Sequence, residues 1–460
     1  MMEIKQNHKS LEYELIIEKI NRALEEDSID LFRSEFLELH PYDQANIFIN
    51  LPKEIRLQIY TYLSPDEMSE IIEHFELENV GEIITEMNPR FAAQIFDELS
   101  TDDAVDIMNT LERNQIASYL TLMNREEARE IKNLLHYEER TAGSIMTTEY
   151  VVVNQNMTIR QAMLHLREKA PDAETIYYVF VTDDDKRLVG VISLRDLIIS
   201  EEEWIVSDIM SERVVYASAG DDQESIAKLM RDYDFLALPV VDFKKHLLGI
   251  ITVDDILDVM DEEASDDYSK LAAVTDMDRN DLSAVDAAKK RLPWLIILLF
   301  LGMITASLIG QFEQTIEQVA LLAVFIPLIA GMAGNTGTQA LAVTVRGIAT
   351  GDAMSEGVLK RLLRESLTGF ITGITCGAVI ILIVVVWQGV DQIFLGLVVG
   401  ISIMASLIVA TIAGAFLPLL MHKIKIDPAV ASGPFITTIN DIISVIIYFG
   451  LATMFMEYLS

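Results

Sequence analysis

Long apolar runs near the end of the chain constrain its fold more than any other feature. Each is near or above the ~20 residues that an α-helix, rising ~1.5 Å per residue, needs to cross a hydrocarbon core about 30 Å thick. Because lipid offers the backbone no hydrogen-bond partners, such runs cross as helices. The sequence therefore predicts an all-α membrane domain of five transmembrane helices over residues 292–460, with spans at roughly 292–310, 319–345, 367–387, 393–420 and 429–456.

Basic residues flank these runs at every second connection. Cytosolic loops carry an excess of Lys and Arg, so the pattern predicts a multi-pass protein of the cell membrane with a cytoplasmic N-terminus and the C-terminus outside. Five crossings agree with opposite locations for the two ends. The basic residues lie before the first run, between the second and third, and between the fourth and fifth: Lys289, Lys290, Arg291, Arg346, Lys360, Arg361, Arg364, Lys423 and Lys425.

The fifth run holds one carboxylate, Asp441. An ionised aspartate at the bilayer centre costs roughly 2.5 to 3.5 kcal/mol, so its side chain should face protein, a water-filled cavity or a cation. Thr437, Thr438 and Asn440 lie beside it. Oxygen ligands without thiolate or imidazole suit a hard cation such as Mg²⁺. The run therefore predicts a cation path with Asp441 as its charged point; the alternative is an aspartate that only hydrogen-bonds neighbouring helices.

The second run contains the segment PLIAGMAGNTGTQALAVTVRG, residues 327–347. Its proline and glycines would allow close helix approach and freed backbone carbonyls, which are tolerable only against protein or a wet cavity. Packing alone would need only the glycines. The polar Asn335, Thr338 and Gln339 favour the lining of a path.

Charge divides the chain at about residue 290. Residues 291–460 carry 7 Lys or Arg and 9 Asp or Glu, so 28 of the 35 basic and 62 of the 71 acidic residues precede them, a net charge of −34. An acidic body of this kind should repel nucleic acid and anionic membrane surfaces and attract cations. Simple solubility is the alternative explanation of the acidity.

Residues 1–145 contain a short helical repeat, which predicts a small α-solenoid. Ser64, Asn88, Ser100 and Asn124 follow four of the repeated apolar residues and are good helix N-caps. An acidic patch, Asp97, Asp102, Asp103 and Asp106, is expected to be solvated unless another acidic surface faces it. One apolar series recurs every twelve residues: Ile47, Ile59, Ile71, Ile83, Ile95, Ile107, Tyr119 and Ile131. A second series follows four residues later: Leu51, Leu63, Phe75, Met87, Leu99, Leu111, Met123 and Leu135.

Residues 146–203 and 204–262 are two copies of one α/β unit. Met146 aligns with Met210, and the switching periodicity predicts β-α-β-β-α in each copy. Both copies end in G-hydrophobic-hydrophobic-[ST]-x-x-D-[LI], and the pair resembles a tandem of CBS domains. In that family the cleft between the domains often binds an adenosine nucleotide, although other pairs are empty hinges. The matching positions are Ser193, Asp196, Thr252 and Asp255.

An acidic connector follows the second copy. Residues 263–291 are expected to form a long connecting helix, acidic at first and amphipathic towards the membrane. Like charges four residues apart, such as Asp254 and Asp258, destabilise a lone helix by a few tenths of a kcal/mol per pair, and a bound cation would remove that penalty. Lys270 is the one basic residue near these acids. The alternative is a solvated, partly frayed linker.

The order of these parts, with P-x-x-x-G-x-x-G-N-x-G-x-Q in the second span and D-P-A-x-x-S-G-P-x-x-x-T-x-x-D in the fifth, resembles the MgtE family of magnesium transporters. The resemblance covers essentially the whole chain. It implies a homodimer that conducts Mg²⁺ between its two membrane domains. Asp441 matches the pore carboxylate of the family, Asn335 lies in the matching glycine-rich motif, and Asp427 matches a carboxylate near the cytosolic mouth.

The resemblance also implies that cytosolic Mg²⁺ closes the pore through acidic sites of the soluble domains and connecting helices. By position, the residues that carry this role over are, first in the connector and then in the second CBS copy, Asp255, Asp258, Glu263, Asp266, Asp267, Asp222, Glu224 and Asp234. Which solenoid acids complete the sites does not follow from the sequence.

Other functions remain open at this point. The alternatives to a Mg²⁺ transporter are a CBS-regulated transporter of another divalent cation or of an organic solute, and an intramembrane aspartyl protease. The protease would need two carboxylates that share a proton, and Asp441 is alone in its span. An organic-solute transporter should show paired broken helices. We therefore expect a Mg²⁺ transporter and no enzyme.

Overall fold

A computed structural model describes residues 16–75, 77–274, 284–350, 357–428 and 433–459. The chain divides into two compact units, Met1–Met260 and Asp261–Ser460. Parts of three predictions lie outside the described residues: the start of the solenoid, residues 275–283 of the connector, and residues 429–432 of the fifth apolar run.

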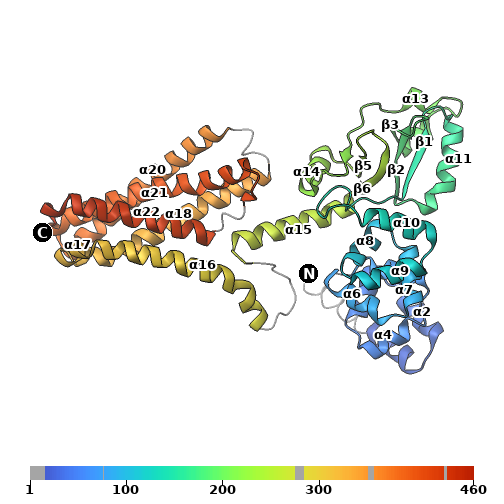
Figure 1. Ribbon diagram of the computed structural model, residues 1–460, viewed down its shortest axis with the longest axis horizontal. Helices are drawn as coiled ribbons and strands as arrows, with labels where there is room; N and C mark the ends of the chain where they lie inside the picture. Colours follow the sequence, from blue (N-terminus) through green and yellow to red (C-terminus); the bar gives the residue numbers. More distant parts are fainter. Residues whose placement is uncertain (1–15, 76, 275–283, 351–356, 429–432, 460) are drawn as a thin grey trace, which may run out of the picture. The chain divides into compact units, whose positions relative to one another are not determined.

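The first unit begins with a stack of short helices, which confirms the helical N-terminal domain (Figure 1). In the domain's core, the α5 helix packs on α3 and α7, α8 packs on α6 and α10, and α9 packs on α7 and α10. The helices are α2 (Ile29–Phe36), α3 (Pro41–Ile49), α4 (Lys53–Ile59), α5 (Pro65–Ile72), α6 (Leu77–Glu86), α7 (Pro89–Glu98), α8 (Thr101–Asn109), α9 (Arg113–Leu122) and α10 (Arg125–Leu134).

Both twelve-residue series point into this core. All members of the first series are buried, and those of the second are buried or pack partly buried against the core. The second series does not share the helices of the first, however, because its members lie just beyond the helix ends. Ser64, Asn88, Ser100 and Asn124 are helix N-caps, as predicted, so each preceding helix must end before its cap residue.

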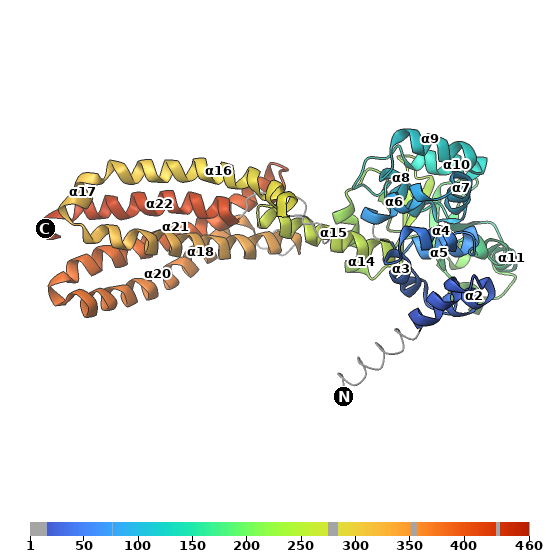
Figure 2. The ribbon, with the colours of Figure 1, turned by 90° about the horizontal axis from the view of Figure 1, so that it is seen from below.

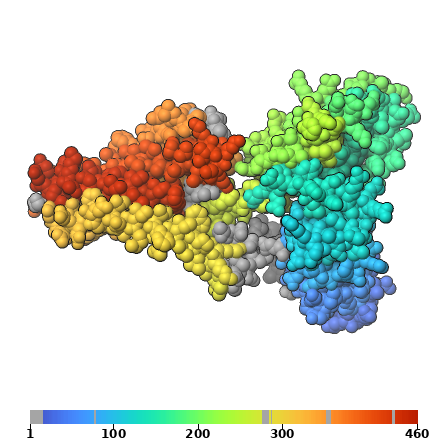
Figure 3. All heavy atoms as spheres, viewed as in Figure 1, coloured from blue at the N-terminus to red at the C-terminus, as the bar shows by residue number. Residues whose placement is uncertain are grey.

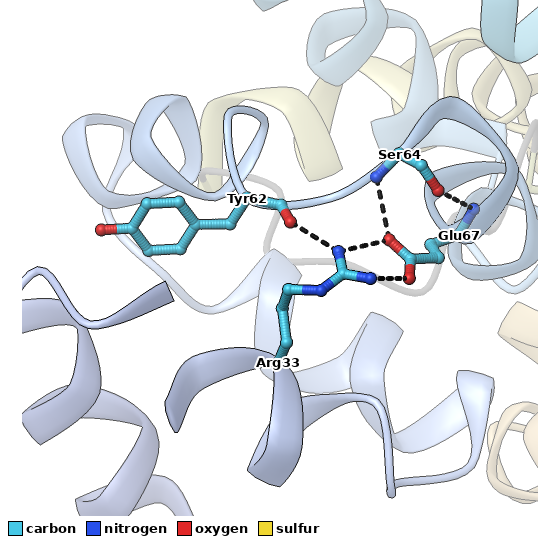
Figure 4. Close-up of polar contacts among 4 residues, drawn as sticks. All are labelled: Arg33, Tyr62, Ser64 and Glu67. Atoms are coloured by element: carbon cyan, nitrogen blue, oxygen red, sulfur yellow. Dashed lines mark hydrogen bonds and ion pairs between the residues drawn. The ribbon is translucent and has the colours of Figure 1, made fainter. Parts of the chain in front are cut away.

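Figure 4 shows how one cap also joins two helices. Ser64 and Glu67 form a reciprocal capping box at the start of α5, with Glu67 N–H donating to Ser64 Oγ at 3.2 Å and Ser64 N–H donating to Glu67 Oε2 at 2.9 Å. Arg33, on α2, donates to both carboxylate oxygens of Glu67 and to the carbonyl of Tyr62. This bidentate pair fixes α2 against the turn that precedes α5.

Each CBS copy holds a three-stranded sheet, in the orders β1-β2-β3 and β4-β5-β6, with the first pair parallel and the second antiparallel. The atoms of this pair and of the helical domain form one continuous body (Figure 3). The strands are β1 (Tyr150–Asn154), β2 (Thr175–Thr182), β3 (Leu188–Ser193), β4 (Ala217–Ser218), β5 (Ala237–Val241) and β6 (Leu247–Thr252). The helices are α11 (Ile159–Lys169), η1 (Ala170–Asp172), α12 (Leu194–Ile199), α13 (Val206–Ile209) and α14 (Gln223–Tyr233).

Two glycines allow the CBS copies to interlock. Gly190 in β3 lies under the side chain of Met210, which opens the second copy. Gly249 in β6 lies under Met146, which opens the first copy, and a Cβ there would be 2.5 Å from the carbonyl oxygen of Thr147. Each copy therefore covers a strand of the other, and the two form one module.

The connector is built differently from the prediction. The α15 helix (Val253–Leu271) starts directly after β6 and runs through the expected boundary at 262/263. The basic segment before the first span belongs to α16 (Ala284–Gln311), which continues into that span. The described parts of residues 263–291 are therefore the last turns of α15 and the first turns of α16.

The second unit contains five helices long and apolar enough to span a membrane, as predicted. They lie alongside one another (Figure 2), with α21 in contact with α18, α20 and α22, and α16 packed on α22. The elements after α16 are α17 (Glu313–Gln318), α18 (Leu321–Ala349), α20 (Val358–Gln388), η2 (Val390–Gln392), α21 (Ile393–Lys423), α22 (Gly433–Met454) and η4 (Met456–Tyr458).

The structure adds two details to the predicted spans. The α18 helix continues through Pro327 and its glycines. Pro327 has no N–H to donate to the carbonyl four residues before it, so a backbone carbonyl is freed while the helix stays continuous. Gly433 and Pro434 are the first two described residues of α22, and residues 429–432 before them lie outside the described part of the chain. Proline is compatible with the first turn of a helix, where its missing N–H has no partner to lose.

Candidate functional sites

Asp441 lies in α22 against a glycine of α18. Its Oδ1 atom is buried and has no hydrogen-bond partner among the described residues. A Cβ on Gly334 would lie 3.6 Å from this oxygen and 2.6 Å from the Cγ2 atom of Thr437. The glycine therefore lets α18 approach the carboxylate face of α22 closely.

The same two helices also carry hydroxyl groups near this carboxylate. Thr437 and Thr438 donate to the carbonyls of Gly433 and Pro434, each at 2.9 Å, and the Thr437 hydroxyl is 3.2 Å from that of Thr338. Thr437, Thr438 and Asp441 share one face of α22 by their three- and four-residue spacing. A hydroxyl that donates to its own helix still offers lone pairs, so these groups can accept from a hydrated cation.

The amides of the two motifs lie in different surroundings. Asn335 and Gln339, four residues apart on α18, are exposed on the single chain. Asn440 is 2% exposed and packs on Gly337, and neither of its amide atoms has a hydrogen-bond partner among the described residues. Its predicted contact with a cation stays a prediction.

A second group of carboxylates, the acidic cluster, joins the helical domain to the CBS pair within the first unit. It centres on Asp102 and Asp103 of α8 and Asp255 of α15. Asp102 is 7% exposed, and its Oδ1 has no hydrogen-bond partner among the described residues. Asp103 accepts from Ser100 Oγ at 2.8 Å, and Asp255 accepts from Thr252 Oγ1.

Burial and mutual repulsion raise the pKa values of this acidic cluster. The pKa of Asp102 is raised well above its usual value, first by burial and then by the negative charge of Asp255. Burial, followed by the charges of Asp254 and Asp103 against the opposing hydrogen bond from Thr252, raises the pKa of Asp255 to about 7. The ionised carboxylates are thus an unfavourable arrangement that protons or cations would relieve.

Two glutamates of the first CBS copy, which were not predicted from the sequence, extend the acidic cluster. Burial and the charge of Glu174 raise the pKa of Glu149 to about 8. Desolvation, followed by the negative charges of Asp254 and Asp103, raises the pKa of Glu174. No periodic signal marks these residues, since they flank strands. Within the described residues, no three or more of these side chains are already arranged to hold a metal ion.

The last turns of α15 form a third acidic group in the second unit. Asp427, between α21 and α22, accepts from Lys270 Nζ at 2.6 Å, and Asp266 lies 3.5 Å from the same ammonium. The pKa of Asp267 is raised by burial and then by the charge of Asp427. The structure therefore brings together the predicted Asp266, Asp267 and Asp427.

The remaining predicted regulatory residues are spread over α15 and α14. Asp258 is exposed, and its negative charge adds to burial in raising the pKa of Asp103. The charge of Glu263 likewise adds to burial in raising the pKa of Asp267. Asp222 caps α14 by accepting from Ser225 N–H at 3.2 Å.

The other two residues predicted to be regulatory in the second CBS copy belong to α14, the helix that Asp222 caps. Glu224 is in the first turn of α14, and Asp234 ends that helix in the left-handed region, with φ +54°. A regulatory role for Asp222, Glu224 and Asp234 stays a prediction.

A cavity of about 470 Å³ lies in the CBS module. Of the predicted nucleotide residues, Ser193 lines it, and Asp196 accepts from Ser193 Oγ at 2.6 Å. Thr252 and Asp255 occupy the equivalent place in the second copy and do not line this cavity. Its other lining residues were not predicted from the sequence; they are Tyr177, Tyr178, Leu194, Arg195, Ile198, Ile199 and Leu236.

Comparison with known families agrees with this architecture. Residues 39–140 match the MgtE intracellular N domain, residues 142–202 and 206–262 match CBS domains, and residues 326–451 match MgtE, described as a divalent cation transporter. The fold and these matches define a multi-pass membrane protein with a helical-repeat domain and a CBS pair. The chain belongs to the MgtE family.

Whole-length relatives and a solved structure support this assignment. The chain is 53% identical over 438 residues to the magnesium transporter MgtE of Enterococcus faecalis, covering 95% of this chain and 96% of the relative. It is 41% identical over 451 residues to that of Bacillus subtilis, covering 98% and 100%. A crystal structure of the cytosolic domain of the Mg²⁺ channel MgtE in complex with ATP matches with TM-score 0.51 and 39% identity, covering 53% of this chain and 99% of that one.

Proposed function

We propose that this protein is a homodimeric Mg²⁺ transport channel of the cell membrane, closed by Mg²⁺ that binds to its cytosolic acidic groups. The observation that carries the transport proposal is Asp441, whose buried oxygen has no hydrogen-bond partner among the described residues of a membrane helix. A cation supplies the missing partner. The relatives named as magnesium transporters favour this reading over the organic-solute and protease alternatives.

The exposed polar face of α18 supports the proposed homodimer. Asn335 and Gln339 would face lipid in a lone chain, and polar side chains within a bilayer are found against protein or water. If this face meets its counterpart around a twofold axis, it lines a wet path to which Asp441 contributes two carboxylates. This arrangement also places the neighbouring hydroxyls of Thr437 and Thr438 along the path.

The donor set suits a hydrated divalent ion. Mg²⁺ gives up its water reluctantly and is usually held by one or two carboxylates with several waters retained. Two copies of Asp441 with hydroxyl and amide oxygens meet that need. Selectivity then follows from spacing that fits the hydrated ion.

The acidic cluster of Asp102, Asp103 and Asp255 supports the proposed regulation by Mg²⁺. At low Mg²⁺ these carboxylates repel one another, and burial together with this repulsion raises their pKa values. Bound Mg²⁺ would draw them together and stabilise the closed state. A ligand shifts such an equilibrium only by its difference in affinity between the states, so several weak sites acting together suit a sensor of millimolar Mg²⁺.

Growth of a strain that depends on this transporter tests the transport proposal. We expect Asp441→Ala to abolish growth in low Mg²⁺, because the path loses its charge. Glu457→Ala, which removes an exposed carboxylate from η4 outside the spans, is the matched control and should support growth. Normal growth of Asp441→Ala at wild-type abundance would reject the proposal.

We also propose that the CBS cavity binds an adenosine nucleotide. Tyr177 offers an exposed ring for base stacking and Arg195 an exposed cation for phosphate. We expect ATP to raise the melting temperature of the full chain, and Tyr177→Ala to reduce that rise, whereas Tyr42→Ala, on α3, should leave it unchanged. An equal rise in wild type and Tyr177→Ala would exclude this cavity.

A further inference from the structure

The last turn of α15 places a lysine among carboxylates. This helix carries eight acidic residues and one basic residue, Lys270. The Lys270 ammonium donates to Asp427 Oδ2 at 2.6 Å and lies 3.5 Å from Asp266 Oδ2. The three side chains remain about one-third exposed, so ions in solution can reach them.

This contact lies where α15 meets two helices of the membrane domain. Leu271, the next residue, packs against Leu341 and Val345 of α18 and Ile436 of α22. The backbone confirms the approach, since a Cβ on Gly433, the first residue of α22, would lie 3.5 Å from the carbonyl oxygen of Leu271. Lys270 is therefore held beside the start of the helix that carries Asp441.

We infer that Lys270 is a tethered competitor of divalent cations for the carboxylates of Asp427 and Asp266. This inference rests on the proposed binding of Mg²⁺ to the acidic groups and names the residue that sets its threshold at this one. Mg²⁺ binds carboxylate oxygens at roughly 2.1 Å. An ammonium in direct contact with Asp427 Oδ2 occupies the same lone pairs and repels the incoming ion, so Mg²⁺ must displace it.

Tethering makes this competitor effective in spite of its single charge. Lys270 cannot diffuse away from Asp427, so its local concentration is set by the chain rather than by the solution. A divalent ion prevails only above a threshold concentration. Like charge on the helix would otherwise favour divalent binding at much lower concentrations, because Glu262 and Asp266, like Glu263 and Asp267, are acids four residues apart on α15.

A purely structural clamp predicts the opposite sign. If Lys270 only held α15 against the loop before α22, its removal would loosen that contact and weaken Mg²⁺ binding to Asp427. If it competes, its removal strengthens Mg²⁺ binding. The direction of the change therefore separates the two roles.

Hydrogen–deuterium exchange of the full-length protein in detergent, read on peptides from the second half of α15 during a Mg²⁺ titration, gives the local midpoint. We expect Lys270→Gln to lower the half-protecting Mg²⁺ concentration roughly three- to fivefold, the size of a partly exposed ion pair. Lys270→Arg keeps the charge and should stay near wild type. Lys19→Gln, which removes a lysine paired with Glu35 at 2.8 Å, is the matched control and should cause no shift.

A second comparison shows whether the effect runs through Asp427. In the Asp427→Asn background, adding Lys270→Gln should shift the midpoint less than it does in wild type. An unchanged or higher midpoint in Lys270→Gln overturns the inference. Because the readout requires no ion flux, a failure to transport Mg²⁺ would reject the proposed function and leave this result interpretable.

Discussion

Two aspartates each bury a carboxylate oxygen that has no hydrogen-bond partner among the described residues. Asp441 does so within a span and Asp102 within the first unit. A buried polar group without a partner costs free energy, and an ionised one costs more. The cost of each is consistent with a cation or proton that completes the site. The two residues therefore mark the proposed path and the proposed sensor.

The pH dependence of stability tests the acidic cluster of Asp102, Asp103 and Asp255. The folded pKa of Asp255 is about 7, above its usual 3.8, so between these values the folded state binds more protons than the unfolded state. The cluster's contribution to stability is thus present at low pH and lost as pH rises through about 7. We expect the Mg²⁺-induced rise in melting temperature of the full chain to be larger at about pH 8 than at about pH 6.

Substitutions at single carboxylates provide the control. Asp102→Asn removes a group whose pKa is raised by burial, so the Mg²⁺-free melting temperature should fall less steeply with pH than in wild type. Asp66→Asn makes the same charge change at an exposed position in α5 and should leave the slope unchanged. An equal response to Mg²⁺ at both pH values would contradict the role given to the cluster.

At the scale of elements, local signals in the sequence predicted most of the fold. The twelve-residue period identified the core of the helical domain, and cap residues such as Ser64 and Asn124 marked where its helices start. Apolar length identified the five membrane helices. These features depend on neighbours close in the chain, so one sequence contains them.

Features that depend on distant contacts could not be predicted. No local signal predicts that Glu149 and Glu174 join Asp102 in one acidic cluster, because three separate segments supply these residues. The pairing of Lys270 with Asp427 spans 157 positions. Nor could the exposure of Asn335 and the burial of Asn440 be distinguished, since both are amides in apolar runs.

The α15 helix belongs to both acidic groups, and this leads to a prediction about regulation. Neutralising its acids should leave Mg²⁺ conduction intact and abolish inhibition by internal Mg²⁺, because the cation loses its ligands. The substitutions, to Asn or Gln, are at Asp255, Asp258, Glu263, Asp266 and Asp267. Patch-clamp recording with varied Mg²⁺ on the cytosolic side measures the inhibition.

A variant with the same change in net charge controls for long-range electrostatics. It neutralises exposed acids of the helical domain and should keep the inhibition, at Asp30, Glu54, Asp66, Glu82 and Glu126. Retained inhibition in the α15 variant would refute the sensor role of this helix.

In the whole molecule, charge and hydropathy distinguish an acidic part from an apolar part. Residues 1–290 carry a net charge of −34 and the remainder −2, and the chain also divides by contacts into two units. An acidic body concentrates cations near it, whereas the apolar part needs only isolated charges to move them. The division fits a transporter whose acid-rich domains respond to the ion that its membrane domain carries.

We propose that Mg²⁺ crosses the membrane along the face of α22 that holds Asp441. Purified protein reconstituted into liposomes with an internal Mg²⁺-sensitive dye measures it most directly. We expect Mg²⁺ influx with wild type and with Asp391→Asn, an exposed acid in η2, and no influx with Asp441→Asn at equal reconstitution. Influx through Asp441→Asn at the wild-type rate would show that Mg²⁺ does not need this carboxylate to cross.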